Sequence, residues 1–337
     1  MKNILILGGT NFIGRHLVQE LLGNSEFQLT LFNRGKTNPE LFPEVNRIVG
    51  DRENSEDLKP LFLQNWDVVI DLSCYYPKGL KQILEKINPS IKNYILISSC
   101  SVYDMHYKGT LRDEKSPILP CSIEQETDTT VASYGNRKSK CETVLQSSGL
   151  PFTILRPSLV YGPYDNTDRF YYWIYQAAKR EKIIVPESGE RKFSITYVKD
   201  LVKTILETIE SSIGNQVFNC ITYPEVSIAV ILNEVLKEVD TEPKLINMDA
   251  DFLFEKGIKQ WEDIPLWLNT DDFTFSNQSL KTEFNFKPTI FENSVKTTVD
   301  YYAKLGFPEP NYGINKVLQN ELLEQFAENE QKHVRHK

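Results

Sequence analysis

The sequence is poor in the residues that build metal centres and disulfide frameworks. Its 337 residues include only 5 cysteines and 4 histidines. The cysteines are odd in number and form no Cys-x-x-Cys pair, which favours reduced thiols over disulfides or a zinc site. Two of the histidines, His333 and His336, belong to a polar segment at the end of the chain. We therefore predict no metal and no histidine-based metal chemistry.

Long apolar runs and an excess of positive charge are also missing. No run of about 18 apolar residues occurs, so a membrane-spanning helix is not expected. The net charge of -8 argues against a broad nucleic-acid-binding surface, because such surfaces gather Lys and Arg against phosphates, although a local basic groove is compatible with it. Met1-Lys2 leads directly into strand-like residues and leaves no room for a signal peptide. We expect a globular cytoplasmic protein of one large or two modest domains, with a small-molecule partner and no nucleic acid or membrane.

The N-terminal segment has the pattern of a strand, a glycine turn and a helix. Ile4 to Leu7 are apolar, residues 8–14 read GGTNFIG, and residues 15–22 have a helical pattern. The unpaired N-H groups of such a helix favour an anionic pyrophosphate in the turn, with Gly8 making the turn and Gly14 allowing close packing. Asn11 replaces the expected middle glycine, and because asparagine tolerates a left-handed backbone, we expect the turn to survive. A purely structural turn is the alternative.

Short apolar strands alternate with helical patterns in the rest of the N-terminal half. We predict strands at 28–32, 46–49, 66–70, 94–97 and 152–155, and helices near 55–63, 78–88 and 133–148. This alternation predicts an α/β fold, a Rossmann-like doubly wound parallel sheet with helices on both faces. We assign residues 1–162 to this sheet domain, together with returning segments near 190–222.

The C-terminal half is less regular. In residues 163–310 prolines interrupt aromatic clusters, which predicts mainly a smaller, interleaved substrate-binding part. Residues 311–337 are predicted to form a final helix and a polar tail. The apolar side chains of this helix share one face. We favour packing of that face on its own domain, and a homodimer contact is the alternative.

Two groups of polar residues suggest an active site. Tyr134 and Lys138 are four apart and share one helix face, so the lysine can favour the tyrosinate of a group whose ordinary pKa is about 10. Ser98 and Ser99 follow the strand at 94–97, at the sheet edge where ligands bind in such folds. Each group alone fits a structural role better. Together they predict a serine that donates to a substrate oxygen while Tyr134 transfers a proton.

These motifs together resemble an extended, or atypical, member of the short-chain dehydrogenase/reductase superfamily, in its NAD(P)-dependent epimerase/dehydratase family. The resemblance covers most of the chain, and several ordered motifs are far more specific than one. It implies an NAD(P)-binding Rossmann domain and an oxidoreductase or epimerase acting at a secondary alcohol or ketone carbon of a small or nucleotide-sugar-like substrate. The resembling segments are Gly8 to Gly14, Gly50-Asp51, Ser98-Ser99 to Tyr103, Tyr134 to Lys138, Arg156-Pro157 to Pro163, and Phe193 to Leu201.

The resemblance also implies a role for each matching residue. Tyr134 would be the general acid/base, Lys138 would lower its pKa and hold the nicotinamide ribose, and Ser99 would polarise the substrate oxygen. Asp51 would lie beside the adenine, and the backbone after Pro157 beside the nicotinamide amide. The cofactor-binding set is Gly8, Thr10, Asn11, Phe12, Ile13, Gly14, Asn33, Arg34, Asp51, Arg52, Ser73, Ser98, Tyr134, Lys138, Pro157 and Ser158.

The cofactor and substrate are argued from basic side chains. The second strand is followed by Asn33-Arg34-Gly35-Lys36 instead of an acidic residue, which favours NADP(H) over NAD(H) because arginine suits a 2'-phosphate. Stacking of Arg34 on the adenine is the alternative. Arg169 and Arg191 are candidates for binding an anionic group of the substrate such as a nucleotide diphosphate. A solvated charge is the alternative for each.

Departures from the family pattern narrow the activity. Cys100 and Ser101 stand where dehydratases of this branch carry an Asp-Glu pair, so dehydration is disfavoured, while net reduction and epimerisation both remain open. Residues 31–36 and 50–52 also resemble the chloroplast stem-loop-binding proteins, RNA-binding relatives of this fold. A non-catalytic RNA-binding or cofactor-sensing protein is therefore the alternative. Tyr134, Lys138 and the acidic charge favour the enzyme.

Overall fold

The computed structural model describes residues 1–107, 109–211, 214–268 and 272–335. The chain divides into two compact units. Unit 1 comprises Met1–Val160, Ile195–Pro224 and Phe275–Pro288, and unit 2 comprises Tyr161–Ser194, Glu225–Thr274 and Thr289–Lys337.

Unit 1 is built on a seven-stranded sheet in the order β10-β6-β5-β4-β1-β2-β3. All of its neighbouring strands pair in parallel. The strands are rich in buried Ile, Leu and Val on both faces, as expected where helices cover both sides of a sheet. The strand order changes direction between β1 and β4. Ligands of such sheets bind at this point, beyond the carboxyl ends of the strands. The strands are β1 (Lys2–Leu7), β2 (Phe27–Asn33), β3 (Asn46–Val49), β4 (Val68–Asp71), β5 (Asn93–Ile97), β6 (Phe152–Pro157) and β10 (Gln216–Cys220).

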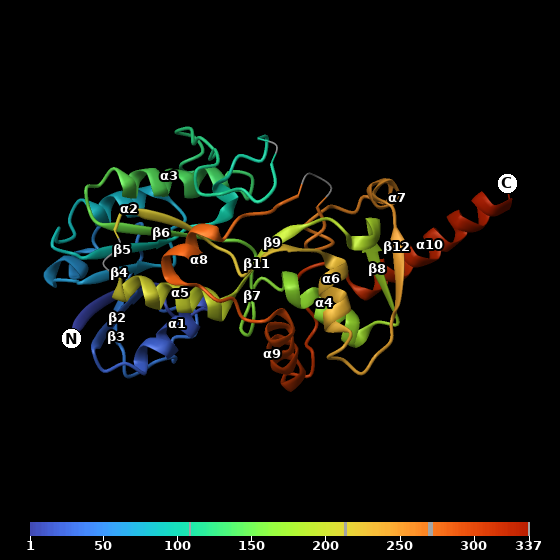
Figure 1. The fold of residues 1–337 in the computed structure, drawn as a ribbon, viewed down its shortest axis with the longest axis horizontal. Helices are drawn as coiled ribbons and strands as arrows, with labels where there is room; N and C mark the ends of the chain where they lie inside the picture. The colour runs from blue at the N-terminus through green and yellow to red at the C-terminus, as the bar shows by residue number, and fades with distance from the viewer. Residues whose placement is uncertain (108, 212–213, 269–271, 336–337) are drawn as a thin grey trace. The chain divides into compact units, whose positions relative to one another are not determined.

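Helices cover the two faces of this sheet (Figure 1). On one face, α1 (Phe12–Leu22) and α5 (Val198–Glu210) share an apolar cluster with side chains from β1, β2, β4 and β5. On the other face, α2 (Pro77–Leu84) and α3 (Tyr134–Gln146) pack into a second cluster. The predicted doubly wound parallel sheet is therefore confirmed.

The main difference in unit 1 concerns the helix predicted near 55–63. Only a short 3-10 helix, η1 (Lys59–Leu63), forms there. Pro60 lies in its first turn and cannot donate a backbone hydrogen bond. The preceding residues instead form turns through the side chains of Asp51 and Asn54. Two further short elements are η2 (Cys100–Val102) and α8 (Gln278–Phe284), whose Phe284 ring packs on Phe218 of β10 at 5.3 Å.

Unit 2 is mainly helical and contains a two-stranded parallel sheet of β8 (Lys182–Pro186) and β12 (Lys244–Met248). Three short strands, β7 (Val160–Tyr161), β9 (Phe193–Tyr197) and β11 (Tyr223–Val226), lie where the chain passes from one unit to the other. The remaining elements of unit 2 are α4 (Arg169–Lys179), η3 (Glu187–Gly189), α6 (Ile228–Val235), α7 (Ala250–Glu255), α9 (Phe291–Lys304) and α10 (Lys316–Arg335).

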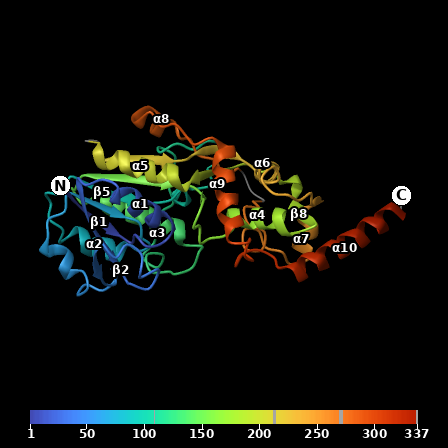
Figure 2. The same cartoon turned by 90° about the horizontal axis from the view of Figure 1, so that it is seen from below.

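The final helix is longer than its apolar pattern predicts. It continues to Arg335 through most of the segment predicted as a polar tail, and Figure 2 shows its end projecting away from α4 and β8 of the same unit. Leu322 is buried, and the Phe326 ring packs on Phe252 of α7 at 5.1 Å. The apolar face of α10 thus contacts its own unit. Residues 336–337, including His336, lie outside the described part of the chain.

Across the described ranges, no helix combines the length and the apolar character that spanning a membrane would require.

Candidate active site

The glycine turn after β1 brings the chain backbone close to itself. Gly8 and Gly9 have φ of +115° and +102°, a region that side chains disfavour. A Cβ on Gly14 would lie 2.7 Å from the Cα of Gly9, so only glycine allows α1 to pack this closely on the turn. Asn11 precedes the helix with φ -123° and ψ 154°. Our argument from left-handed tolerance of Asn11 is therefore wrong, because its backbone is extended.

The first turn of α1 presents unpaired backbone donors. The first bond of the helix joins the N-H of Arg15 to the carbonyl of Asn11, which leaves the preceding N-H groups of Phe12, Ile13 and Gly14 without intrahelical partners. Thr10 and Phe12 are buried, whereas Asn11 is exposed. This is the arrangement that binds phosphate groups at helix N-termini.

The end of β2 lies beside the same turn. The Asn33 side chain donates to the Gly8 carbonyl at 3.0 Å and accepts from the Gly35 N-H at 3.0 Å. Asn33 therefore holds the turn and the strand end together. Arg34 is exposed, and no hydrogen bond or ion pair of its guanidinium occurs within the described residues.

A buried ion pair lies beneath the loops after β3 and β4. Arg52 forms two charge-assisted hydrogen bonds to Asp71, at 2.6 and 2.9 Å, and its contact to the Ser73 hydroxyl is 3.4 Å. Tyr94 also donates to Asp71, at 2.8 Å. Burial alone would lower the pKa of Arg52, but Asp71 raises it well above its usual value. The Arg52 side chain is thus committed to the protein, while the Asp51 carboxylate accepts from the Glu53 N-H at 3.0 Å.

Lys138 lies at the carboxyl edge of the sheet. Its Nζ donates to the carbonyls of Cys74, at 2.9 Å, and Ile97, at 2.7 Å, which follow β4 and end β5. A lysine ammonium has three donors, so one is left for another acceptor. Burial would lower the pKa of Lys138, but nearby Tyr134 and the Cys74 thiol raise it above the ordinary value. Lys138 therefore stays positively charged beside Tyr134.

The start of α3 is held against the loop that carries Ser99. A Cβ on Gly135 would lie 2.2 Å from the carbonyl oxygen of Ser101, so the helix and the loop touch through their backbones. Ser99 caps η2 by accepting from the Ser101 N-H at 3.1 Å. The structure thus brings the segments of Tyr134 and Ser99 together, as their positions in the sequence predict.

Behind these residues lies a buried polar network that sequence reasoning missed. Ser98 donates to Glu142 at 2.5 Å, and Glu142 pairs with Arg156 at 2.5 to 3.2 Å. Arg156 donates to the Tyr103 hydroxyl at 2.9 Å, which donates to Asn219 at 2.6 Å. The spacing of Glu142, four residues after Lys138, could have indicated it. The network ties α3 to the ends of β5, β6 and β10.

The end of β6 carries a buried hydroxyl that lacks a partner. Pro157 ends the strand, and the Ser158 N-H donates to the Thr196 hydroxyl at 3.1 Å. The Ser158 Oγ is buried and has no hydrogen-bond partner within the described residues. Such an atom costs free energy unless a further group binds it. Together with the glycine turn and the free donor of Lys138, it fits a dinucleotide along the carboxyl edge.

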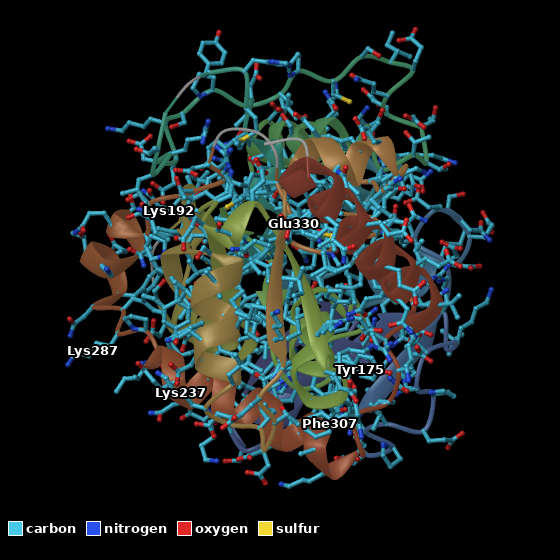
Figure 3. All side chains as sticks on the ribbon, turned by 90° about the vertical axis from the view of Figure 1, so that its right-hand side faces the viewer. Tyr175, Lys192, Lys237, Lys287, Phe307 and Glu330 are labelled. Carbon is cyan, nitrogen blue, oxygen red and sulfur yellow. The ribbon has the colours of Figure 1, made fainter. Side chains whose placement is uncertain are left out.

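Arg169 and Arg191, the predicted substrate residues, belong to unit 2. The Arg169 guanidinium lies over the Trp261 ring at 5.4 Å. Arg191 lines a cavity of about 330 Å³ with Glu187, Lys192 and Trp267. A second cavity of about 270 Å³ is lined by Tyr175 and Arg180. Figure 3 labels one residue of each cavity, Lys192 and Tyr175, and the two lie well apart in that view.

Within the part of the chain that the structure describes, no three His, Cys, Asp or Glu side chains gather in a way that could hold a metal ion.

Comparisons with known proteins identify the family of the chain and similar folds. The model of the NAD dependent epimerase/dehydratase family matches residues 4–220. The chain is 31% identical over 234 residues to a chloroplast stem-loop binding protein of Arabidopsis thaliana, an alignment that spans 65% of this chain and 58% of that protein. It is 28% identical over 238 residues to an uncharacterized UDP-glucose epimerase of Bacillus subtilis, covering 60% and 71% of the two chains.

Solved structures of similar fold include UDP-glucuronic acid 4-epimerase from Bacillus cereus in complex with UDP-glucuronic acid and NAD. The TM-score is 0.67 at 21% identity, covering 90% of this chain and 99% of that one. At this identity the likeness establishes the fold alone.

Proposed function

Because this chain belongs to the NAD dependent epimerase/dehydratase family, a family of NAD-dependent enzymes, we propose that it oxidises or reduces a secondary alcohol or ketone carbon of a nucleotide-sugar-like substrate. The observation that carries this proposal is the Lys138 ammonium, held by two backbone carbonyls at the carboxyl edge with one donor left beside Tyr134. Net reduction and epimerisation both use this chemistry.

In the proposed mechanism each residue has a defined part. The glycine turn and the N-terminus of α1 would hold the pyrophosphate, while Lys138 and the Ser158 hydroxyl would hold the nicotinamide half. The bound cofactor supplies the hydride acceptor or donor. Tyr134 takes the proton of the substrate hydroxyl during oxidation and returns one during reduction, and the positive charge of Lys138 favours the tyrosinate form. Ser99 orients the substrate oxygen.

The direct test replaces Tyr134 by phenylalanine, which removes the proton donor and keeps most of the ring. With UDP-glucose or UDP-glucuronic acid as the first substrates to screen, we expect kcat to fall about 100- to 10,000-fold, a far larger change than any loss of cofactor affinity from the missing hydroxyl. Unchanged turnover would remove Tyr134 from the mechanism.

We further propose that the protein prefers NADP(H), although the similar structure named above contains NAD. The proposal is supported by Arg34, which is exposed beside the turn, and by Asn33 in the place of an acidic residue. Arg34→Ala is expected to weaken NADPH binding about 10-fold and NADH binding little, as measured by calorimetry. Equal losses for both would favour stacking of Arg34 on the adenine.

Arg191 and Arg169 are proposed to bind the anionic part of the substrate. Arg191 lines a cavity with Trp267, and the two offer a guanidinium and an aromatic surface for a nucleotide diphosphate. The carboxylates of Glu187, Glu190 and Asp272 line the same cavity, and the nearby Lys192 ammonium pairs with Glu225 at 3.0 Å, so Arg191 is the cation on which the proposal rests. A cytoplasmic location and a homodimer stay predictions from the sequence.

A non-catalytic RNA-binding protein is the second candidate, and the similarity to a stem-loop binding protein supports it. Binding of a stem-loop RNA at physiological salt by the wild-type chain, without turnover or cofactor binding, would favour this alternative.

A further inference from the structure

The loop after β4 carries a tyrosine, Tyr75, that is not among the predicted site residues. Tyr75 follows Cys74, the residue whose carbonyl binds Lys138. The Lys138 Nζ lies 5.9 Å from the centre of the Tyr75 ring, within the range of a cation-π contact. The Tyr75 ring therefore stands next to the charged half of the proposed catalytic pair.

This tyrosine is not a core residue. It is 51% exposed at the carboxyl edge, and its hydroxyl makes no hydrogen bond within the described residues. Burial of the hydroxyl end raises the pKa of Tyr75, nearby Lys138 opposes this, and nearby Tyr134 adds to it. The hydroxyl is therefore a protonated donor near Tyr134, on a ring that is half exposed.

The next residue in the chain gives a useful contrast. Tyr76 is half-buried and packs under the Arg137 guanidinium, 5.1 Å from its ring centre. It precedes the first residue of α2, and its aromatic ring has a structural partner. The two adjacent tyrosines thus contact successive residues of α3, but only Tyr75 contacts Lys138 and keeps an exposed ring surface.

From this juxtaposition we propose that Tyr75 is a substrate-binding residue, which packs its ring against the sugar-like ring of the substrate and donates its hydroxyl to a substrate oxygen near Tyr134. This inference rests on the proposed function, since it assigns a wall of the same site. A half-exposed tyrosine gives large contact area at low entropic cost, and its hydroxyl adds orientation. Tyr75 would then help to select which ring hydroxyl is presented to Tyr134.

The test compares three variants of the full chain. Tyr75→Phe removes the hydroxyl, Tyr75→Leu removes the ring, and Tyr76→Phe is the matched control on the neighbouring residue. Binding of UDP-glucose and UDP-glucuronic acid is measured by calorimetry with the protein saturated with NADPH, and kcat and KM are measured where turnover is found. Cofactor affinity is titrated separately.

We expect Tyr75→Phe to weaken binding of the UDP-sugar about 3- to 10-fold, which is the effect of one neutral hydrogen bond. Tyr75→Leu should weaken it further, whereas Tyr76→Phe and the cofactor affinity of every variant should be unchanged. If both Tyr75 variants bind the UDP-sugar as the wild type does, the proposal is overturned. If they weaken cofactor binding as much as sugar binding, Tyr75 acts through Lys138 and the proposal is also overturned.

The outcome for the wild type separates this proposal from the proposed function. A wild-type protein that binds the cofactor and the UDP-sugar, with insensitive Tyr75 variants, rejects the role of Tyr75 alone. A wild-type protein that binds neither UDP-sugar rejects the proposed substrate class, and the assignment of Tyr75 falls with it.

Discussion

At the scale of single residues, side chains of the candidate site are held in position by hydrogen bonds to other buried groups of the protein. Lys138 is held by the carbonyls of Cys74 and Ile97, so its position follows from the ends of β4 and β5. Ser98 is held by Glu142, which is paired in turn with Arg156. The residues proposed to contact the cofactor and substrate are therefore supported by a second layer of buried partners.

Breaking the ion pair of Glu142 and Arg156 should strongly lower the free energy of unfolding. Glu142→Gln leaves the Arg156 guanidinium buried without a counter-ion, and we expect a loss approaching the roughly 3–5 kcal/mol that removal of one buried partner costs. Urea unfolding measures this change. The control is Glu126→Gln, because Glu126 pairs with Lys81 and Lys140 near the surface, where an ion pair contributes about 1 kcal/mol or less. Equal effects of the two substitutions would contradict the importance of the buried network.

Asp165 gives a prediction about pH. Burial raises the pKa of this carboxyl to about 6, while its Oδ2 has no partner within the described residues. The unfolded-state pKa is about 3.9, so between pH 4 and 6 the folded protein binds more protons and stability falls as the pH rises. Above pH 6 the buried, ionised Asp165 carboxylate lowers the free energy of unfolding by on the order of 3 kcal/mol.

Asp165→Asn removes this titration and keeps an acceptor for Thr167. The wild type should lose stability from pH 4.5 to pH 7.5 through this group, whereas the variant should not. The free energy of unfolding of the variant minus that of the wild type should therefore be larger at pH 7.5 than at pH 4.5, as measured by urea unfolding at both values. A stability difference that does not change with pH would show that Asp165 titrates normally.

Some site residues could be placed from the sequence, and others could not. The motifs placed Tyr134, Lys138 and Ser99 on elements that do meet, because each follows from strand and helix periodicity. The backbone of Asn11 and the commitment of Arg52 to Asp71 could not be foreseen. Both depend on what the neighbouring chain offers, which no local pattern contains.

At the scale of elements, the start of α3 is the critical junction. Ser133 precedes the helix and donates to Asp128 at 2.5 Å, and hydrogen bonds from Ser133 and Thr130 lower the pKa of Asp128 to about 2. On the other side, Gly135 touches the backbone of Ser101. The first turn of α3 is thus held in place from two directions, and Tyr134 with it.

Gly135→Ala should disturb this junction. The added Cβ would meet the Ser101 carbonyl at 2.2 Å, and backbone atoms cannot move aside easily. We expect a destabilisation of about 1–3 kcal/mol and a clear loss of kcat, because the helix start would shift from the Ser99 loop. Gly109→Ala is the control, since nothing lies within 4 Å of its added Cβ. A Gly135→Ala variant with wild-type thermal stability and kcat would contradict this account.

At the scale of the whole molecule, the fold of unit 1 was predictable from the sequence. Alternating apolar strands and helices are enough to specify a doubly wound parallel sheet, and its strands lie within a few residues of the predicted ranges. Unit 2 was not predictable in detail. Its aromatic cluster at residues 170–173 forms part of the helix α4, which the weak periodicity of this half did not indicate. The unit is assembled from three segments that lie far apart in the chain, so its packing depends on contacts that no local pattern contains.

The central claim is that the carboxyl edge of the unit 1 sheet binds a nicotinamide dinucleotide. A calorimetric titration of the purified chain with NADPH and with NADH, at moderate salt and without substrate, tests it most directly. We predict saturable binding at one site per chain, tighter for NADPH than for NADH. Absence of binding for both would contradict the account.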